Sequence, residues 1–473
     1  MARLRLSTIL VGLYGAFALG AFVPRTDLAS DDAAIVPPRM LSFPVRHEQH
    51  DETVERRRVR RADDTDAQIF NYSSVAYMIE LDLGTPGQTV KVIMDTGSSE
   101  LWVNPDCRTA SSLPQQSECF SSDYYDPDKS STVVISNRGK TLRYGLGDAT
   151  IRYVTDDVAL PNSDVSLHSL RFGVATETNQ MSHGILGLSF GNGLNLDYDN
   201  FVDALVDQGV IDTRLFGVAL GAKEEAADSG LITFGGLDTK KFSGKLHTER
   251  ILGPQNGEDL YRFWVTLTGI GLTDDSGNSK TYMDKNLAVF FDTGATLSYL
   301  PADVVKGLAQ DLNAEYRSDY DLYLVPCGQK GSVDFTFNNV TIHVSLDEFI
   351  WELRDGTCAL GAMAENDNSY LLGASFLRST YAVFDLESPA IHFAQYANCG
   401  SNLQEVPAGT DAAARFEGEC SKSDIVGSGT ESKGNSSGGD GEDSAAGRNM
   451  IYRRGMWLSV GLVAAEQALA WLV

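Results

Sequence analysis

Two copies of one tripeptide are the residues of this sequence best suited to chemistry. Asp95-Thr96-Gly97 follows the apolar residues Val92-Ile93-Met94, and Asp292-Thr293-Gly294 follows Val289-Phe290-Phe291. Each copy is typical of a buried strand that runs into a carboxylate and then a tight turn. Two carboxylates held in contact cannot both ionise cheaply, so they share one proton. One is then a base that activates water and the other an acid that protonates a carbonyl, which is the chemistry of peptide hydrolysis at acid pH.

A later segment of two apolar residues and a glycine accompanies each tripeptide. Ile185-Leu186-Gly187 follows the first copy and Leu371-Leu372-Gly373 follows the second at a similar interval. A single Asp-Thr-Gly is expected by chance in roughly one chain in ten of this length, given average residue usage. Two copies in matching contexts are far less expected. The repeat therefore predicts two similar halves that each supply one carboxylate.

From about Tyr72 to Cys399 the sequence resembles the pepsin family of aspartic proteases. Motif order, spacing and lobe length all agree with that family. The matching segments are Asp95-Thr96-Gly97-Ser98-Ser99, Leu101-Trp102-Val103, Tyr144-Gly145, His183-Gly184-Ile185-Leu186-Gly187-Leu188, Phe234-Gly235-Gly236, Asp292-Thr293-Gly294-Ala295-Thr296 and Leu371-Leu372-Gly373-Ala374-Ser375-Phe376. The resemblance implies an all-β, bilobal pepsin-like fold, with two similar β lobes and an active-site cleft between them.

The resemblance also assigns roles around the two carboxylates. Asp95 and Asp292 are expected to hold the attacking water, and their separate roles stay open because a coupled pair titrates as a unit. The threonines are expected to bond across the two loops, and the glycines let the backbone approach the carboxylates closely. Ser98 and Thr296 are expected to hydrogen-bond the outer carboxylate oxygens. The dyad-supporting residues are thus Thr96, Gly97, Ser98, Thr293, Gly294 and Thr296.

Glycines near Tyr144 predict a hairpin tip that closes over substrate as a flap. By resemblance, Tyr144 and Gly145 belong to this flap, and Trp102 braces the tyrosine. From composition alone, a core aromatic is an equally good interpretation of Trp102. The combination of secretion, a dibasic-ended propeptide and an anchored tail looks like the fungal yapsin-like branch, whose members cut after basic residues.

One departure from that branch bears on specificity. In several basic-selective members, the residue two positions past the flap tyrosine is Asp, whereas this sequence has Leu146. The nearby carboxylates Asp148 and Glu100 are candidates to take its place. The sequence therefore predicts a cleft that accepts protein and peptide substrates, is inhibited by pepstatin-type compounds and prefers Lys or Arg beside the scissile bond.

Composition restricts the class of protein. The net charge is −26, and no basic block lies outside the N-terminal quarter and the tail, which excludes nucleic acid as a partner. Neither a phosphate loop nor a metal-binding cluster is recognisable, so no cofactor or metal is expected, and we expect a monomer. The alternation from Tyr77 to Gly84 predicts a half-buried strand. Short helices are expected from Asn200 to Gln208 and after Pro301.

The N-terminal segments are typical of secretion and processing. Residues 1–20 have a basic start, an apolar stretch and small residues, which predicts a signal peptide. A first transmembrane helix is the alternative, but the apolar stretch is short of the ~20 residues needed for a span. Residues 21–61 show no clear period and are interpreted as a propeptide that is cut after Arg60-Arg61. A solvated charge run is the alternative.

The remaining chain divides into two lobes and a tail. We expect an N-terminal catalytic lobe over residues 62–250, a C-terminal lobe over 251–400 and a Gly/Ser/Asp-rich linker over 401–444. Residues 445–473 fit a GPI-anchor signal that is removed on maturation, with attachment at Ser444. A permanent tail anchor is the alternative. The expected location is the extracellular face of the plasma membrane, the cell wall or the medium.

Six cysteines in a secreted chain imply disulfides, and sequence alone allows 15 pairings. The resemblance favours Cys107 with Cys119 and Cys327 with Cys358, which leaves Cys399 for Cys420. The Asn-x-Ser/Thr acceptor sites for N-linked sugars begin at Asn71, Asn339 and Asn435.

Two other functions compete with the protease. Gly187-Leu188-Ser189-Phe190-Gly191 fits the nucleophile motif of serine hydrolases, with His343 and His392 downstream as bases. The other alternative is a catalytically silent pepsin-like binding protein on the cell surface. Both aspartates, both threonines and the flap tyrosine are present, which favours an active aspartic endopeptidase over the silent protein.

Overall fold

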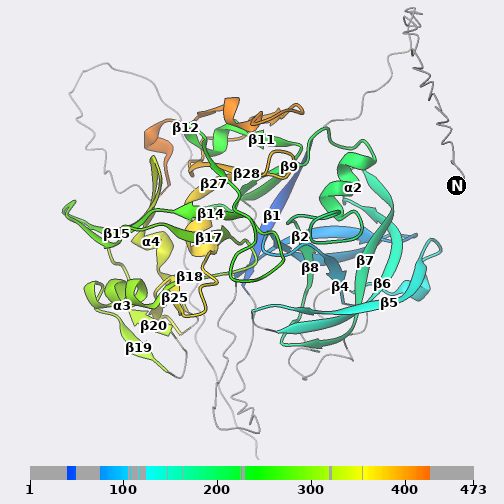
Figure 1. The fold of residues 1–473 in the computed structure, drawn as a ribbon, viewed down its shortest axis with the longest axis horizontal. Coiled ribbons are helices and arrows are strands. Elements are labelled where there is room, and N and C mark those ends of the chain that lie inside the picture. Colours follow the sequence, from blue (N-terminus) through cyan, green and yellow to red (C-terminus); the bar gives the residue numbers. More distant parts are fainter. Residues whose placement is uncertain are drawn as a thin grey trace, which may run out of the picture. The chain divides into compact units, whose positions relative to one another are not determined.

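The computed structural model describes residues 40–49, 75–104, 107, 116, 124–145, 147–161, 163, 165–223, 225, 229–318, 322–353 and 355–426. Strands dominate this part of the chain and helices are few and short (Figure 1), which confirms the predicted all-β class. None of the helices among the described residues has the length and hydropathy needed to cross a membrane.

The largest sheet has thirteen strands and draws on both halves of the sequence. Its order is β13-β28-β27-β9-β10-β1-β2-β3-β8-β4-β7-β6-β5, so late strands lie beside early ones (Figure 1). The strands are β1 (Leu41–Gln49), β2 (Val75–Leu83), β3 (Gln88–Asp95), β4 (Leu101–Val103), β5 (Val134–Arg143), β6 (Asp148–Ala159), β7 (Ser166–Asn179), β8 (Gly184–Gly187), β9 (Leu215–Ala219), β10 (Gly230–Phe234), β13 (His247–Arg250), β27 (Thr380–Asp385) and β28 (Ala390–Gln395).

Smaller sheets form most of the second half. A five-stranded sheet contains β14 (Trp264–Leu267), β17 (Leu287–Phe291), β26 (Leu371–Leu372), β18 (Ser298–Pro301) and β25 (Ala362–Glu365). One four-stranded sheet contains β16 (Ser279–Met283), β15 (Gly269–Asp274), β21 (Gly331–Phe337) and β22 (Val340–Ser345). The other contains β19 (Glu315–Arg317), β20 (Leu322–Val325), β24 (Cys358–Ala359) and β23 (Trp351–Glu352).

The helices are α2 (Phe201–Asp207), α3 (Ala302–Asp311), α4 (Leu346–Phe349) and α5 (Ala374–Leu377). The first begins at Asn200, whose side chain accepts from the Asp203 backbone while the Asp203 side chain accepts in return. This reciprocal cap satisfies two backbone donors that a helix start leaves unpaired. The second follows Pro301 and buries Val304, Val305 and Leu308. Both predicted helices are therefore confirmed.

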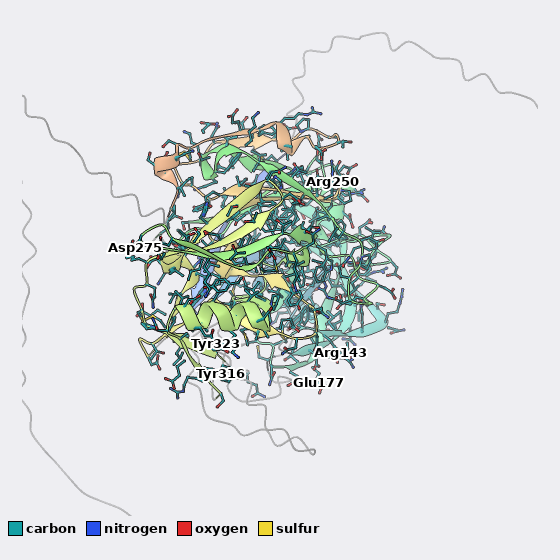
Figure 2. The ribbon with its side chains drawn as sticks, turned by 60° about the vertical axis from the view of Figure 1, so that its left-hand side comes forward. Arg143, Glu177, Arg250, Asp275, Tyr316 and Tyr323 are labelled. Carbon is teal, nitrogen blue, oxygen red and sulfur yellow. A yellow bond between two sulfur atoms is a disulfide. The ribbon has the colours of Figure 1, made fainter. Side chains whose placement is uncertain are left out.

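Strand alternation builds the core of the first half, as predicted for the segment from Tyr77. Tyr77, Ile79, Leu81 and Leu83 are all buried, while Glu80 between them is partly exposed. Burying each such apolar side chain contributes about 1.5–3 kcal/mol. Exposed side chains such as Arg250, Asp275 and Tyr316 lie instead at the periphery (Figure 2).

An aromatic cluster forms the core of the second half. The Phe291 ring lies 5.2 Å from Phe376 and 5.4 Å from Phe393, between centroids, and Phe337 lies 4.9 Å from Phe393. Edge-to-face pairs at these distances add to the stabilisation from burial. Because Phe291 directly precedes Asp292, this cluster fixes the end of the strand that carries the second carboxylate.

A strand lies inside the segment that the sequence analysis assigned to a propeptide without periodicity. β1 pairs antiparallel with β10 from Leu41 to Val45 and with β2 from Arg46 to Gln49. Leu41 and Val45 are buried. The alternation of Leu41, Phe43 and Val45 is the sequence signal that was overlooked, and Pro44 interrupts it. The rest of residues 21–61 lies outside the described residues, apart from Met40.

The structure also corrects the start of the linker, which was expected at residue 401. β29 (Leu403–Glu405) pairs with β11 (Gly236–Asp238), and β30 (Glu417–Glu419) pairs with β12 (Ser243–Lys245). Val406 and Ala413 are buried in a cluster with Phe242 and Val383. Residues up to 426 are therefore part of the folded unit, because they cover apolar side chains that the two lobes leave uncovered.

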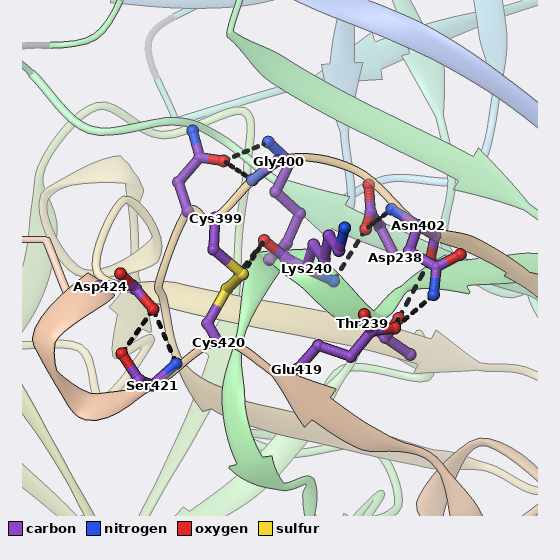
Figure 3. The surroundings of a disulfide bond; sticks show 12 residues. Asp238, Thr239, Lys240, Cys399, Gly400, Asn402, Glu419, Cys420, Ser421 and Asp424 are labelled. Atoms are coloured by element: carbon purple, nitrogen blue, oxygen red, sulfur yellow. Dashed lines mark hydrogen bonds between the residues drawn. A yellow bond between two sulfur atoms is a disulfide. The ribbon is translucent and has the colours of Figure 1, made fainter.

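Hydrogen bonds around a disulfide fasten this final segment (Figure 3). Cys399 is bonded to Cys420, and the Glu419 carboxylate accepts from the Thr239 hydroxyl at 2.6 Å. The Asp238 carboxylate accepts from the backbone of Asn402 at 2.8 Å. The segment is thus held by covalent, polar and apolar contacts together.

Candidate active site

Each carboxylate lies at the end of a strand that is paired in parallel with one of the later apolar-apolar-Gly segments. β3 pairs with β8, which places Asp95 opposite Gly187, and β17 pairs with β26, which places Phe291 opposite Leu372. The Leu188 amide donates to the Asp95 carbonyl at 2.8 Å, and the Asp292 amide donates to the Leu372 carbonyl at 3.1 Å. The two apolar-apolar-Gly segments are therefore the partner strands that hold the Asp-Thr-Gly turns in place.

The two corners bring the carboxylates face to face. The Gly97 amide donates to Asp95 Oδ1 at 2.7 Å, and the Gly294 amide donates to Asp292 Oδ1 at 2.9 Å. A Cβ atom on Gly97 would lie 2.9 Å from the Asp292 carboxyl group, and one on Gly294 would lie 2.7 Å from Asp95 Oδ1. Glycine is thus required at both positions, because each backbone packs against the opposite carboxylate.

The threonines bond across the two loops, as the resemblance implied. The Thr96 amide donates to the Thr293 hydroxyl at 3.1 Å, and the Thr293 amide donates to the Thr96 hydroxyl at 3.0 Å. Each hydroxyl donates in turn to the opposite strand, Thr96 to the Phe291 carbonyl at 2.9 Å and Thr293 to the Met94 carbonyl at 2.7 Å. All four groups are buried, so this symmetric set fixes the two corners relative to each other.

The structure tests the expected bonds to the outer carboxylate oxygens on the Asp95 side. The Ser98 hydroxyl donates to Asp95 Oδ2, as expected. On the other side, the Thr296 carbonyl accepts from the Ser375 amide at 3.0 Å. The expected bond from the Thr296 hydroxyl to Asp292 stays a prediction.

The pKa of Asp292 is raised well above its ordinary value, chiefly because the surrounding protein removes water and also because the Asp95 charge lies beside it. The Gly294 amide and the Arg262 guanidinium act in the opposite direction and lower this pKa. Asp292 is nevertheless partly accessible to solvent. Such a raised pKa keeps a proton on the pair at acid pH.

Arg262 is a site residue that sequence reasoning missed. Its guanidinium donates to the Gly97 carbonyl and lies 5.3 Å from the centre of the Phe290 ring. It also pairs with Glu258 at 3.1 Å. Because Arg262 belongs to no recognisable motif and Gly97 is far from it in sequence, no local signal could have identified this contact.

The flap is formed by the hairpin of β5 and β6. The Tyr144 amide donates to the Gly147 carbonyl at 2.8 Å, which closes the tight turn at its tip. The Trp102 indole nitrogen donates to the Tyr144 hydroxyl at 2.8 Å, so Trp102 both fills a small core and braces the flap. The Tyr144 side chain lies near Asp95. Burial and, after it, the Asp95 charge raise the pKa of Tyr144. A Cβ on Gly145 would meet no atom within 4 Å.

The structure separates the two carboxylates proposed as specificity residues. Asp148 lies on the flap hairpin, directly across from Arg143, and its carboxylate accepts from the side-chain nitrogen of Asn179 at 3.4 Å. Glu100 is 4% exposed and accepts from Lys140 at 2.7 Å and from the Tyr153 hydroxyl at 2.9 Å. Glu100 is therefore already neutralised and does not offer a free carboxylate to a substrate cation. Leu146 lies outside the described residues.

The geometry around Ser189 does not support the serine hydrolase alternative. Ser189 is fully buried and its hydroxyl donates to the Tyr261 carbonyl at 3.3 Å. His392 is buried between Thr248 and Asp385, and His343 contacts Asp334. Within the described part of the chain, no hydrogen bond joins either histidine to Ser189, so the motif is a structural turn.

Two of the three expected disulfides are seen complete, between Cys327 and Cys358 and between Cys399 and Cys420. Cys107 is also disulfide-bonded, while Cys119, its expected partner, lies outside the described residues. Asn339 is exposed at the turn between β21 and β22, and its glycosylation stays a prediction. The other expectations that lie outside the described residues are the signal peptide, Arg60, Arg61, Asn71, Asn435, Ser444 and residues 445–473.

Comparison with known proteins agrees with this geometry. The sequence model of the eukaryotic aspartyl protease family matches residues 76–396, and the chain belongs to that family. It is 32% identical to the probable aspartic-type endopeptidase opsB of Aspergillus fumigatus over 399 residues, which cover 79% of this chain and 80% of the relative. Membership of this family makes the chain a bilobal, pepsin-like aspartic-type endopeptidase.

Yapsins of Saccharomyces cerevisiae are also among the similar proteins. Aspartic proteinase yapsin-3 is 32% identical over 366 residues, which cover 72% of this chain and 70% of the relative. Aspartic proteinase MKC7 is 29% identical over 449 residues, which cover 78% of this chain and 74% of the relative. The predicted similarity to the fungal yapsin-like branch is therefore confirmed.

Proposed function

We propose that the protein hydrolyses peptide bonds at acid pH through Asp95 and Asp292. The observation that carries this proposal is the contact between the two corners, in which each glycine packs against the opposite carboxylate. A water molecule between the carboxylates gives its proton to Asp95 as it attacks the peptide carbonyl. Asp292, whose raised pKa retains a proton, donates that proton to the carbonyl oxygen. Collapse of the resulting diol and transfer of a proton to the nitrogen complete the cleavage.

Substitution of each aspartate tests the dyad. Asp95→Asn and Asp292→Asn keep the side-chain shape but cannot exchange the proton, so each should leave a folded protein with at most a few per cent of wild-type turnover. Activity on a fluorogenic peptide should peak below pH 6 and be blocked by pepstatin. A fully active Asn variant would refute the assignment, and an inactive wild-type protein that binds peptides would favour the silent binding protein.

We further propose a preference for Lys or Arg beside the scissile bond, selected by Asp148. Its position on the flap hairpin supports this role, although Arg143 lies across from it. Asp148→Asn should lower kcat/KM for basic peptides about two- to fivefold more than for apolar ones, since partly exposed ion pairs are weak. Glu177→Gln is a matched control, because Glu177 is exposed on the adjoining strand β7. Equal losses on both peptide classes would exclude Asp148 as the selector.

Maturation and attachment are proposed from the sequence alone. Secretion, cleavage after Arg61 and a glycolipid at Ser444 would place the enzyme on the outer face of the plasma membrane. N-terminal sequencing should find Ala62, and phosphatidylinositol-specific phospholipase C should release active enzyme from cells. A mature membrane-bound protein that retains Trp471 would refute the anchor.

A further inference from the structure

A cavity of about 430 Å³ lies beside the candidate active site. It is formed between the flap strands β5 and β6, strand β7 and the loop around Asn195. Its wall includes Glu100, which follows Ser99 in the first active-site segment, and Lys140, which lies four residues before the flap residue Tyr144. The cavity therefore adjoins both the dyad loop and the flap.

Contacts of Asn195 connect this cavity to the second half of the chain. Its amide nitrogen donates to the Ser99 hydroxyl at 2.9 Å and to the Tyr261 carbonyl at 2.7 Å. The Tyr261 amide donates back to the Asn195 side chain at 2.8 Å. Because Arg262 follows Tyr261 and contacts Gly97, the same bridge links the cavity to the reacting groups.

The charges that face solvent in this cavity are mostly positive. The Lys140 side chain is 51% exposed, whereas its partner Glu100 is only 5% exposed. Two arginines share a single carboxylate, since Arg138 lies 3.3 Å and Arg171 lies 3.8 Å from Asp197. Because Lys140 is paired with Glu100, the remaining charges are two arginines against the single exposed carboxylate of Asp197, in a protein whose net charge is −26.

The cations are partly preorganised for a ligand. The Arg171 guanidinium lies 4.8 Å from the centre of the Tyr198 ring, which limits its freedom. The Tyr198 hydroxyl is buried beside Tyr153 and Glu100. Donors held this way suit a planar carboxylate, which arginine binds through two parallel hydrogen bonds.

We infer that this cavity is a subsite for an acidic side chain, Asp or Glu, of the peptide substrate. The inference rests on the proposed function, because it requires that a peptide lies across the dyad under the flap. Together with a basic residue at the scissile bond, it defines a substrate with opposite charges at two positions. The positive cavity also disfavours peptides that are basic throughout.

Matched peptides test the subsite. A set of fluorogenic peptides would be identical except for Asp or Asn at successive positions on either side of the scissile bond. One position should show a kcat/KM about three- to tenfold higher for Asp, since a bidentate, partly exposed pair is worth somewhat more than a simple surface pair. The preference should weaken in 0.5 M NaCl because salt screens exposed charges.

Substitutions assign the preference to the cavity. The double variant Arg138→Gln and Arg171→Gln should abolish the Asp preference, so that the Asp and Asn peptides are cleaved with the same kcat/KM. Arg152→Gln is the matched control, because Arg152 is an exposed arginine on β6 that does not line the cavity. Thermal unfolding of each variant would verify that it is folded.

The outcomes separate the subsite from the proposed function. Cleavage of Asn peptides without an Asp preference at any position would overturn the subsite and leave the protease intact. An Asp preference that survives in the double variant would overturn the cavity as its cause. Failure of the wild-type enzyme to cut any peptide would overturn the proposed function and the subsite together.

Discussion

At the scale of single residues, the site depends on two carboxylates that lie in contact and share one proton. Asp292 lies beside Asp95 in a position where full ionisation of both is unfavourable. The hydrogen bonds between Thr96 and Thr293 hold the two carboxylates at that position against their mutual repulsion. Catalytic sites of this kind retain local instability because the reaction requires the shared proton.

The raised pKa of Asp292 predicts a pH-dependent stability difference. A carboxyl group whose folded pKa is raised contributes its stability below the unfolded value, about 3.9, and loses that contribution as the pH rises through the folded value. Asp292→Asn has no such loss, so its melting temperature should exceed that of the wild type increasingly from pH 4 to pH 7. Differential scanning fluorimetry measures this trend. Asp275→Asn, at an exposed position, should show none, and parallel wild-type and Asp292→Asn curves would contradict the raised pKa.

The crossing threonines predict a loss of both stability and activity. Thr96→Val keeps the shape but leaves the Thr293 amide buried without its acceptor, which costs about 1–3 kcal/mol. Thr96→Ser retains the hydroxyl and is the control. Urea unfolding and turnover should both fall for the valine variant and change little for serine. Equal behaviour of the two variants would show that the hydroxyl does not fix the dyad.

At the scale of secondary-structure elements, the flap is a hairpin whose base is packed against the first lobe. Leu142, Ala149 and Ile151 on its strands are buried against Trp102. The bond from Trp102 to the Tyr144 hydroxyl joins that packed base to the tip. This packing and this bond together hold the Tyr144 side chain near Asp95.

Breaking this bond should slow catalysis without unfolding the protein. Trp102→Phe retains a buried ring but removes the donor, so kcat/KM should fall about two- to tenfold, the equivalent of one neutral hydrogen bond. Tyr144→Phe should give a similar loss, and the double variant should be no worse than the poorer single variant. Trp351→Phe is the control, because the Trp351 nitrogen makes no hydrogen bond with the described residues. Additive losses for Trp102 and Tyr144 would argue against the brace.

At the scale of the whole molecule, the sheet order joins both ends of the described chain. β1 lies between β10 and β2, and β27 and β28 extend the same sheet from the far end of the sequence. Residues 401–426 then cover an apolar cluster around Leu237 and Phe242. The folded unit is therefore larger at both ends than the two lobes that the sequence delimited.

Truncation tests where this unit ends. A chain that ends at residue 426 should be secreted, soluble and active, whereas one that ends at 400 should be retained or aggregate because Leu237 and Phe242 are uncovered. The variant Cys399→Ser and Cys420→Ser in the longer chain separates the disulfide from the segment, since a disulfide alone is worth about 2–4 kcal/mol. Secretion yield and melting temperature are the measurements. Equal stability of the two truncated chains would show that residues 401–426 are dispensable.

The sequence by itself predicted the class of reaction and the residues proposed to perform it. Each corner is a local pattern, in which an apolar strand, a carboxylate and a glycine turn lie within a few positions, and the repeat implied the contact between them. Helix starts at Asn200 and after Pro301 were predictable for the same reason, since a cap is read within one turn.

Only the tertiary structure decided which side chains surround that chemistry. Arg262 reaches Gly97, Asn195 joins Ser99 to Tyr261, and Lys140 neutralises Glu100, all across long sequence separations. Such contacts depend on how the sheets pack. The sequence around a Glu or Arg does not indicate which distant residue will contact it. The strand at 41–49 and the covering segment at 401–426 were missed for a related reason, because a short strand is recognised only when its neighbours in the sheet are known.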